Sequence, residues 1–120
     1  MKKTKQKFNK FKAIKTNGYD SKKEARRAEE LKILKKNGYI SDLEEQKKFE
    51  LQPSFKICSN KPPFKPETIR SINYIADFYY YDNEKKIWVV EDSKGFRTKE
   101  YIIKSKMFRY IYKDILFIES

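Results

Sequence analysis

The sequence contains no histidine and only one cysteine, Cys58, among its 120 residues. Histidine is the commonest general base and the commonest zinc ligand in proteins, so its absence leaves carboxylates, lysine, tyrosine and hydroxyls to carry any catalysis. A single cysteine excludes an internal disulfide, and no partner residue marks it as a nucleophile. A metal, if one takes part, is expected to be a hard cation held by oxygen ligands. We expect no small-molecule cofactor.

Long apolar runs are also missing from the sequence. No stretch approaches the roughly 18 apolar residues of a membrane-spanning helix, which excludes such a helix. The N-terminal residues are basic but lack the apolar run of a secretory signal, so we expect a cytoplasmic protein.

Positive charge is abundant. Lys and Arg number 29 against 17 Asp and Glu, which gives a formal net charge of +12. Such an excess favours a nucleic acid as the partner, because neutralising phosphates releases condensed counterions. An anionic membrane surface or an acidic protein is the alternative partner. Charged residues make up 38% of the chain, but an aromatic content of 16% argues for a packed fold rather than disorder.

The length fits a single domain, which we place at residues 17–120. Residues 1–16 form a lysine-rich N-terminal arm that we expect to be flexible. The arm either lies along a phosphate backbone or serves only as a solubilising tail.

The pattern predicts an α/β fold in the order helix, three strands, helix, strand. Ser21 caps the first helix, which ends near Asn37, and Thr98 caps the second. The last strand follows its helix by a crossover, so it should run parallel to the strand before that helix. The expected elements are a helix over 22–37, strands over 45–51, 69–81 and 86–93, a helix over 99–112 and a strand over 115–118, with an irregular excursion or long hairpin loop over 53–66.

Two acids and a lysine form the most informative pattern. Asp77 lies within an apolar and aromatic strand, where a charge needs a partner, a metal or an exposed face. Side chains alternate along the next strand, so Asp92 and Lys94 point one way and Glu91 the other. Two carboxylates can hold Mg²⁺, which polarises a phosphate and lowers the pKa of bound water, and a lysine can stabilise the developing charge. The pattern therefore suits phosphodiester hydrolysis.

Asp77 followed by Asp92-Ser93-Lys94 resembles the signature of the PD-(D/E)xK nucleases, and the predicted element order is similar to the restriction-endonuclease-like core of that superfamily. Ala76 replaces the proline of the signature. Further segments between about Tyr19 and Ile118 resemble a family of small phage-encoded endonuclease-like proteins within the superfamily. These segments are Ser21-Lys22-Lys23-Glu24-Ala25, Glu50-Leu51-Gln52-Pro53, Tyr74-Ile75-Ala76-Asp77-Phe78, Val90-Glu91-Asp92-Ser93-Lys94-Gly95 and Thr98-x-x-Tyr101-x-x-Lys104.

The resemblance implies a catalytic set of Glu24, Asp77, Asp92 and Lys94, in which the three acids bind Mg²⁺ or Mn²⁺. Glu24 corresponds to the acid that the superfamily carries on its first helix. The resemblance also implies a Mg²⁺-dependent endodeoxyribonuclease that cuts branched DNA such as Holliday junctions in phage replication or recombination. Such an enzyme would act as a homodimer in the cytoplasm of the host.

The second predicted helix is a candidate nucleic-acid-binding element. Its candidate residues are Lys99, Tyr101, Lys104 and Lys106. Lys104 follows Tyr101 by three residues and therefore lies near it on the helix surface. The other lysines are expected to form a solvated, generally positive surface.

Each candidate also has an ordinary structural explanation. Glu24 stands three residues after Ser21, the spacing of a helix capping box. Asp77 can be a charge on an edge strand, and Asp92 and Lys94 can be a simple surface pair. A strand bulge could exchange the roles of Glu91 and Asp92. The alternative function is a non-catalytic nucleic-acid-binding protein with a nuclease-like fold.

Overall fold

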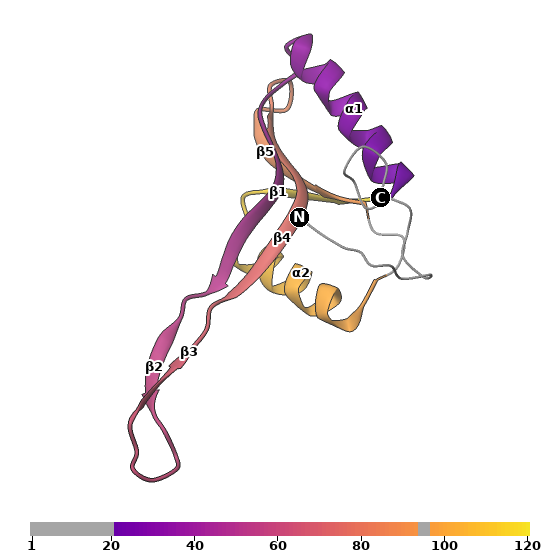
Figure 1. The fold of residues 1–120 in the computed structure, drawn as a ribbon. Coiled ribbons are helices and arrows are strands. Elements are labelled where there is room, and N and C mark those ends of the chain that lie inside the picture. The colour runs from indigo at the N-terminus through magenta and orange to yellow at the C-terminus, as the bar shows by residue number, and fades with distance from the viewer. Residues whose placement is uncertain (1–20, 94–96) are drawn as a thin grey trace.

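A computed structural model describes residues 21–93 and 97–120 and shows a four-stranded sheet with a helix packed on each face (Figure 1). The predicted α/β class, the mixed sheet and the order of its elements are confirmed. The basic segment 1–16 and Lys94 lie outside the described residues. The elements are α1 (Lys22–Lys36), β1 (Ile40–Gln52), β2 (Phe55–Cys58), β3 (Pro66–Ile69), β4 (Ile72–Asp82), β5 (Ile87–Asp92), α2 (Lys99–Ile111) and β6 (Leu116–Glu119).

Helix α1 begins and ends where the sequence predicts. The Ser21 hydroxyl accepts a hydrogen bond from the backbone N–H of Glu24 at 3.0 Å, which caps the first turn. Gly38 follows the helix with a φ of +83°, the left-handed conformation that glycine adopts most readily. Between these ends, Ala25, Ala28 and Leu31 form the buried stripe.

The sheet has the strand order β1-β4-β5-β6. Strand β4 pairs antiparallel with both β1 and β5, and β6 pairs parallel with β5, as the crossover through α2 predicts. Strand β1 begins at Ile40, earlier than predicted, because Ile40 and Leu43 pack against the core beneath α1. Among the residues that the structure describes, neither helix is long and apolar enough to cross a bilayer.

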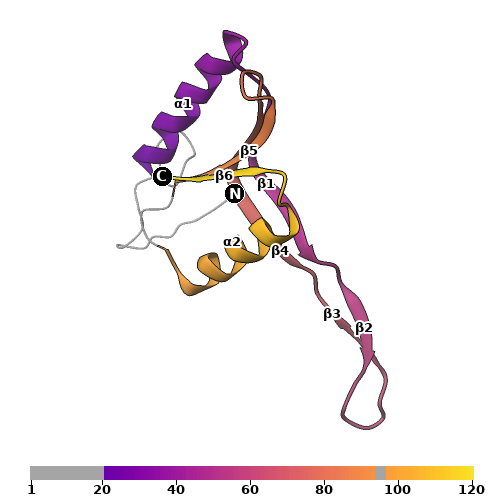
Figure 2. The ribbon, with the colours of Figure 1, turned by 180° about the vertical axis from the view of Figure 1, so that it is seen from behind.

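The segment after β1 is more regular than the sequence suggests. Strands β2 and β3 pair from Phe55↔Ile69 to Cys58↔Pro66 and form a hairpin that projects from the body of the protein (Figures 1 and 2). The predicted strand over 69–81 is therefore two strands, β3 and β4, separated at 70–71. The prolines stand at strand ends and in the loop, where the sheet needs no N–H donor.

Two hydrophobic cores lie on opposite faces of the sheet. The α1-side core contains Ala28, Leu31, Ile40, Phe78, Tyr80 and Val89. The α2-side core contains Phe49, Leu51, Tyr74, Ala76, Val90 and Phe108. Phe108 lies at the centre of the second core, with ring centroids 4.9 Å from Phe49 and 5.0 Å from Tyr74. The neighbouring residues Val89 and Val90 enter different cores, as alternation along a strand requires.

The alternation of faces is interrupted in the middle of β1 and β4. Ala76 belongs to the α2-side core and Phe78 to the α1-side core, although regular alternation, which the sequence predicts, would place them on one face. Strand β1 changes face in the same way between Leu43 and Phe49. Gln46, which lies between those two residues, has a φ of +54°, an uncommon conformation outside glycine. In the paired strands β1 and β4, the side chains that face each core therefore switch sides of the sheet, and the switch occurs at the same position along both strands.

Candidate active site

Glu24 and Asp77 meet at the level where the two strands change face. Both side chains are only 4% exposed. The Gln46 side-chain amide donates to Glu24 Oε2 at 3.0 Å and, over a longer 3.5 Å, to Asp77 Oδ1. One nitrogen atom therefore lies within 3.5 Å of both carboxylates, which come from α1 and β4. The capping position of Glu24 and its place beside Asp77 are compatible, because the backbone N–H donates to Ser21 while the side-chain carboxylate accepts from Gln46.

Asp77 also reaches the end of β5. Its Oδ2 accepts a hydrogen bond of 2.8 Å from the backbone N–H of Ser93. The register of β4 and β5 includes Phe78↔Glu91, so its continuation by one residue places Asp77 opposite Asp92. Residues opposite each other in a sheet point to the same face. The structure thus brings Asp77 beside Asp92, whose side chain is completely buried.

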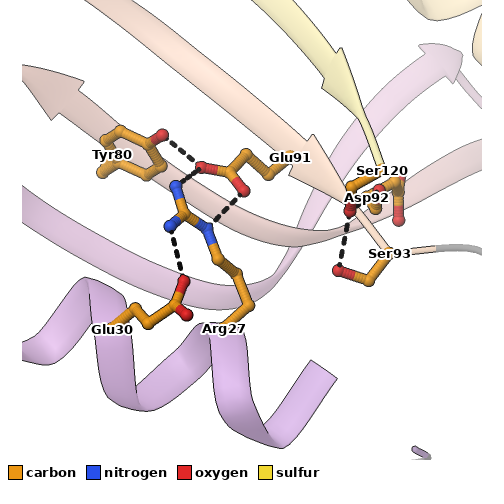
Figure 3. Close-up of polar contacts among 7 residues, drawn as sticks. All are labelled: Arg27, Glu30, Tyr80, Glu91, Asp92, Ser93 and Ser120. Atoms are coloured by element: carbon orange, nitrogen blue, oxygen red, sulfur yellow. Dashed lines mark hydrogen bonds and ion pairs between the residues drawn. The ribbon is translucent and has the colours of Figure 1, made fainter. Parts of the chain in front are cut away.

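Glu91 points from β5 towards Arg27 of α1 (Figure 3). Its carboxylate accepts hydrogen bonds from Arg27 Nε at 2.8 Å and Arg27 Nη2 at 2.7 Å. The Tyr80 hydroxyl donates to the same carboxylate. Asp92 lies on the other side of the strand, and its backbone oxygen accepts from the N–H of Ser120 at 3.0 Å. Glu91 therefore forms an ion pair with Arg27.

The contacts around Glu91 change the pKa values of Arg27 and Tyr80. The hydrogen bond from Arg27 to Glu91 raises the pKa of Arg27, which keeps the guanidinium charged. Burial, followed by the hydrogen bond to Glu91, raises the pKa of Tyr80 well above that of a free tyrosine. Both shifts favour the arrangement in which Arg27 carries a positive charge and Tyr80 keeps its proton.

A cavity of about 410 Å³ opens at the start of α2 and is lined partly by Tyr101 and Lys104. Thr98 caps this helix by accepting from the N–H of Tyr101 at 3.0 Å. Lys104 Nζ lies 2.8 Å from Glu100 Oε2. The other two candidate residues of this helix, Lys99 and Lys106, are exposed and do not line the cavity. The remaining lining residues are Asn73, Tyr74, Ile75, Thr98 and Glu100.

Tyr101 connects the cavity with the acidic residues. Burial is the largest cause that raises the pKa of Tyr101, and a hydrogen bond to Glu119 adds to it. The negative charge of Asp92 raises the same pKa further. Glu119, which accepts the hydrogen bond from Tyr101, is the residue of β6 that pairs with Asp92 of β5. The cavity at α2 and the buried Asp92 are therefore neighbouring parts of one region.

The donor atoms of this region suit a hard divalent cation. Glu24, Asp77 and Asp92 offer carboxylate oxygens, the ligands that Mg²⁺ prefers. The Gln46 amide already places a positively polarised hydrogen between two of those carboxylates. Within residues 21–93 and 97–120, however, no group of three or more Asp, Glu, Cys or His side chains is spaced to hold a metal ion. A three-carboxylate site would therefore need a small rearrangement of the side chains.

The sequence does not single out Gln46. Its role depends on two acids that lie 22 and 31 residues away in the chain, and its residue type has no pattern of its own in β1. The lysine of the predicted catalytic set, Lys94, lies outside the described residues, so only its position two residues after Asp92 is known.

A family model described as a protein of unknown function (DUF1064) matches residues 3–118, nearly the whole chain. No curated protein and no solved structure matches the chain.

Proposed function

The chain belongs to the DUF1064 family, and we propose that it is a metal-dependent endonuclease that hydrolyses phosphodiester bonds of DNA. The observation that carries the proposal is the meeting of Glu24, Asp77 and the end of β5: the Gln46 amide contacts both carboxylates, and the N–H of Ser93 donates to Asp77. The resemblance of the sequence to PD-(D/E)xK nucleases supports it independently. The net charge of +12 supports a polyanionic substrate.

The clustering of buried acids supports a functional role. Glu24 and Asp77, both 4% exposed, share a contact with the Gln46 amide, and Asp77 lies opposite the buried Asp92. Buried acids held near each other are costly to a fold and are often found where a protein binds a cation or performs chemistry.

Mg²⁺ or Mn²⁺ is the cofactor we propose, held by Glu24, Asp77 and Asp92. Such an ion would supply a Lewis acid for the phosphate and a more acidic water. The Asp77 carboxylate is oriented by the N–H of Ser93, and the Glu24 carboxylate by Gln46. Lys94 is the residue that we propose to stabilise negative charge on the phosphate as the bond breaks.

The substrate we propose is double-stranded DNA with a branch, such as a Holliday junction. This choice rests on the resemblance to phage-encoded endonuclease-like proteins, as do the homodimer and the place of action in the host cytoplasm. The cavity beside Tyr101 and Lys104 is linked to the position of Asp92 through Glu119, and we propose that it receives a nucleotide next to the cleaved bond.

The proposal is tested by cleavage assays on branched and linear DNA with Mg²⁺, Mn²⁺ or EDTA. Asp77→Asn keeps the shape of the side chain but removes its charge, so it should abolish cleavage and leave DNA binding intact. The matched control is Asp114→Asn, a change at an exposed acid, which should cleave like the unmodified protein. Absence of metal-dependent cleavage on every substrate would refute the proposal.

The second candidate is a nucleic-acid-binding protein without catalysis. It is favoured by one observation: among the described residues, no three-ligand group is already assembled. Under this alternative, the unmodified protein and Asp77→Asn bind DNA equally and neither cleaves it.

A further inference from the structure

The hairpin of β2 and β3 is the part of the described chain that the proposed active site does not use. It projects away from the sheet and from both helices (Figures 1 and 2). Residues 53–68 are exposed throughout, except for the half-buried Ser59. We call residues 53–69 the hairpin arm. A two-stranded hairpin alone is marginally stable in water.

The hairpin arm exposes apolar side chains that its own fold does not cover. Phe55 is 42% exposed, Ile57 44% and Phe64 56%. Phe55 and Ile57 lie on one face of the ribbon because they are two residues apart on the same strand. The hairpin arm therefore offers three exposed apolar side chains to a partner.

The tip of the hairpin arm has a defined conformation. The N–H of Phe64 donates to the carbonyl of Lys61 at 2.8 Å, and the N–H of Ser59 donates to the carbonyl of Lys65 at 3.0 Å. Phe64 has a φ of +62°, which is unfavourable for a bulky residue. The loop thus holds a large apolar side chain outward, in a conformation that it would not adopt by preference.

The charge of the hairpin arm indicates the class of partner. It carries three lysines, Lys56, Lys61 and Lys65, against one acid, Glu67. Two of these lysines flank the apolar sequence Pro62-Pro63-Phe64 at the tip. Lysines beside a groove neutralise phosphates, and proline or phenylalanine can enter the minor groove between base steps. A second copy of the chain is a poorer match, because each copy brings the same excess of positive charge to the contact.

We propose that the hairpin arm binds double-stranded nucleic acid, with Lys61 and Lys65 on the phosphates and Phe64 in the groove. By the usual rise per residue, the arm extends roughly 25 Å from the sheet. It would therefore contact the duplex away from the buried acids. The proposal concerns the binding of DNA and does not require that the protein cleaves it.

The experiment measures binding of a labelled DNA duplex by fluorescence anisotropy in EDTA, over a series of salt concentrations. The Lys61→Glu/Lys65→Glu variant should bind about tenfold more weakly, with a salt slope lower by about 2. The matched control is Lys85→Glu/Lys113→Glu, which makes the same change of charge at exposed positions outside the arm. The salt slope of this control should be close to that of the unmodified protein. Equal effects of the two variants would overturn the proposal.

Phe64→Ala separates the apolar contact from the charges. It should weaken binding several-fold without changing the salt slope, because no phosphate contact is lost. Analytical ultracentrifugation of the same variant tests whether the hairpin arm instead contacts a second copy of the chain. A dimer of the unmodified protein that dissociates in Phe64→Ala, with DNA binding unchanged, would assign the arm to a second copy and overturn the proposal.

These outcomes are independent of the catalytic proposal. Binding is measured without a divalent ion, whereas cleavage is tested through Asp77→Asn. If the protein cleaves DNA but the arm variants bind no more weakly than the control variant, only the arm proposal is refuted. If the arm variants bind more weakly but the unmodified protein never cleaves, only the nuclease proposal is refuted.

Discussion

The guanidinium of Arg27 binds the carboxylate of Glu91 through two hydrogen bonds, of 2.8 and 2.7 Å. This pair joins the middle of α1 to the end of β5 (Figure 3). Because neighbouring side chains on a strand point to opposite faces, fixing Glu91 towards α1 turns Asp92 away from it. The sequence alone left open whether Glu91 or Asp92 belongs to the proposed active site. Because Glu91 is paired with Arg27, we propose Asp92.

Arg27→Ala should destabilise the protein, because it leaves the Glu91 carboxylate, which is 3% exposed, without its cation. Since the Arg27 side chain is itself 31% exposed, we expect the lower end of the range for broken buried pairs, a loss of about 3 kcal/mol in the free energy of unfolding. Urea denaturation measures this loss. Arg26→Ala, at the exposed neighbouring residue, is the control and should cost much less. Similar losses in the two variants would contradict a structural role for the pair.

Gln46→Glu should make the protein more dependent on a divalent cation. The new carboxylate would lie beside Glu24 and Asp77, so repulsion should lower the melting temperature in EDTA. Added Mg²⁺ or Mn²⁺ should then raise the melting temperature more than in the unmodified protein, because the cation binds the folded state. Gln52→Glu makes the same change elsewhere on β1 and serves as the control. An equal response of both variants to Mg²⁺ would count against a cation site at Gln46.

Lys104→Ala should weaken DNA binding by about fivefold, close to 1 kcal/mol, because Lys104 lines the cavity beside Tyr101. Lys106→Ala removes an equal charge from the exposed surface of α2 and should have a smaller effect. Anisotropy titrations with the same duplex compare the two variants. If both substitutions weaken binding equally, α2 contributes only general positive charge and the cavity has no particular role.

Tyr80→Phe should change how stability depends on alkaline pH. The pKa of Tyr80 is raised in the folded protein by burial and by Glu91, so the folded state holds this proton more tightly than the unfolded state. The stability that the shift contributes is present below about pH 10, where a free tyrosine ionises, and is lost as the pH rises further. The difference in unfolding free energy between the unmodified protein and Tyr80→Phe should therefore shrink above that pH.

The control for this experiment is Tyr110→Phe, at a side chain that is 71% exposed. Its stability should follow that of the unmodified protein over the whole pH range. A constant difference between the unmodified protein and Tyr80→Phe would show that the hydroxyl does not share the buried environment of Glu91.

Local patterns made the helices and most of the sheet predictable. Ser21 and Thr98 cap their helices through their own side chains. The boundary between β3 and β4 was not predictable, because both strands have the same alternating pattern and only the projection of the hairpin separates them. The face change at Gln46 was missed for a similar reason: a positive φ at a glutamine has no local sequence pattern.

The candidate site was predictable only in part. The spacing of Asp77 and Asp92 on joined strands predicted that they meet, and the register supports this. The place of Glu24 beside them came from the resemblance and agrees with its contact with Gln46. Residues 53–66 were expected as a long hairpin loop or an irregular excursion, because prolines interrupt strands. The structure pairs β2 with β3 there, since those prolines stand where the ribbon tolerates them.

The irregular backbone of β1 also has a consequence for self-association. Strand β1 is an outermost strand of the described sheet, and the outer side of such a strand can accept an additional strand from another molecule. Positive φ values at Asp42 and Gln46 interrupt the straight row of N–H and C=O groups that fibrillar stacking requires. The same distortion that places Gln46 beside two acids thereby makes the β1 edge a poor template for an added strand.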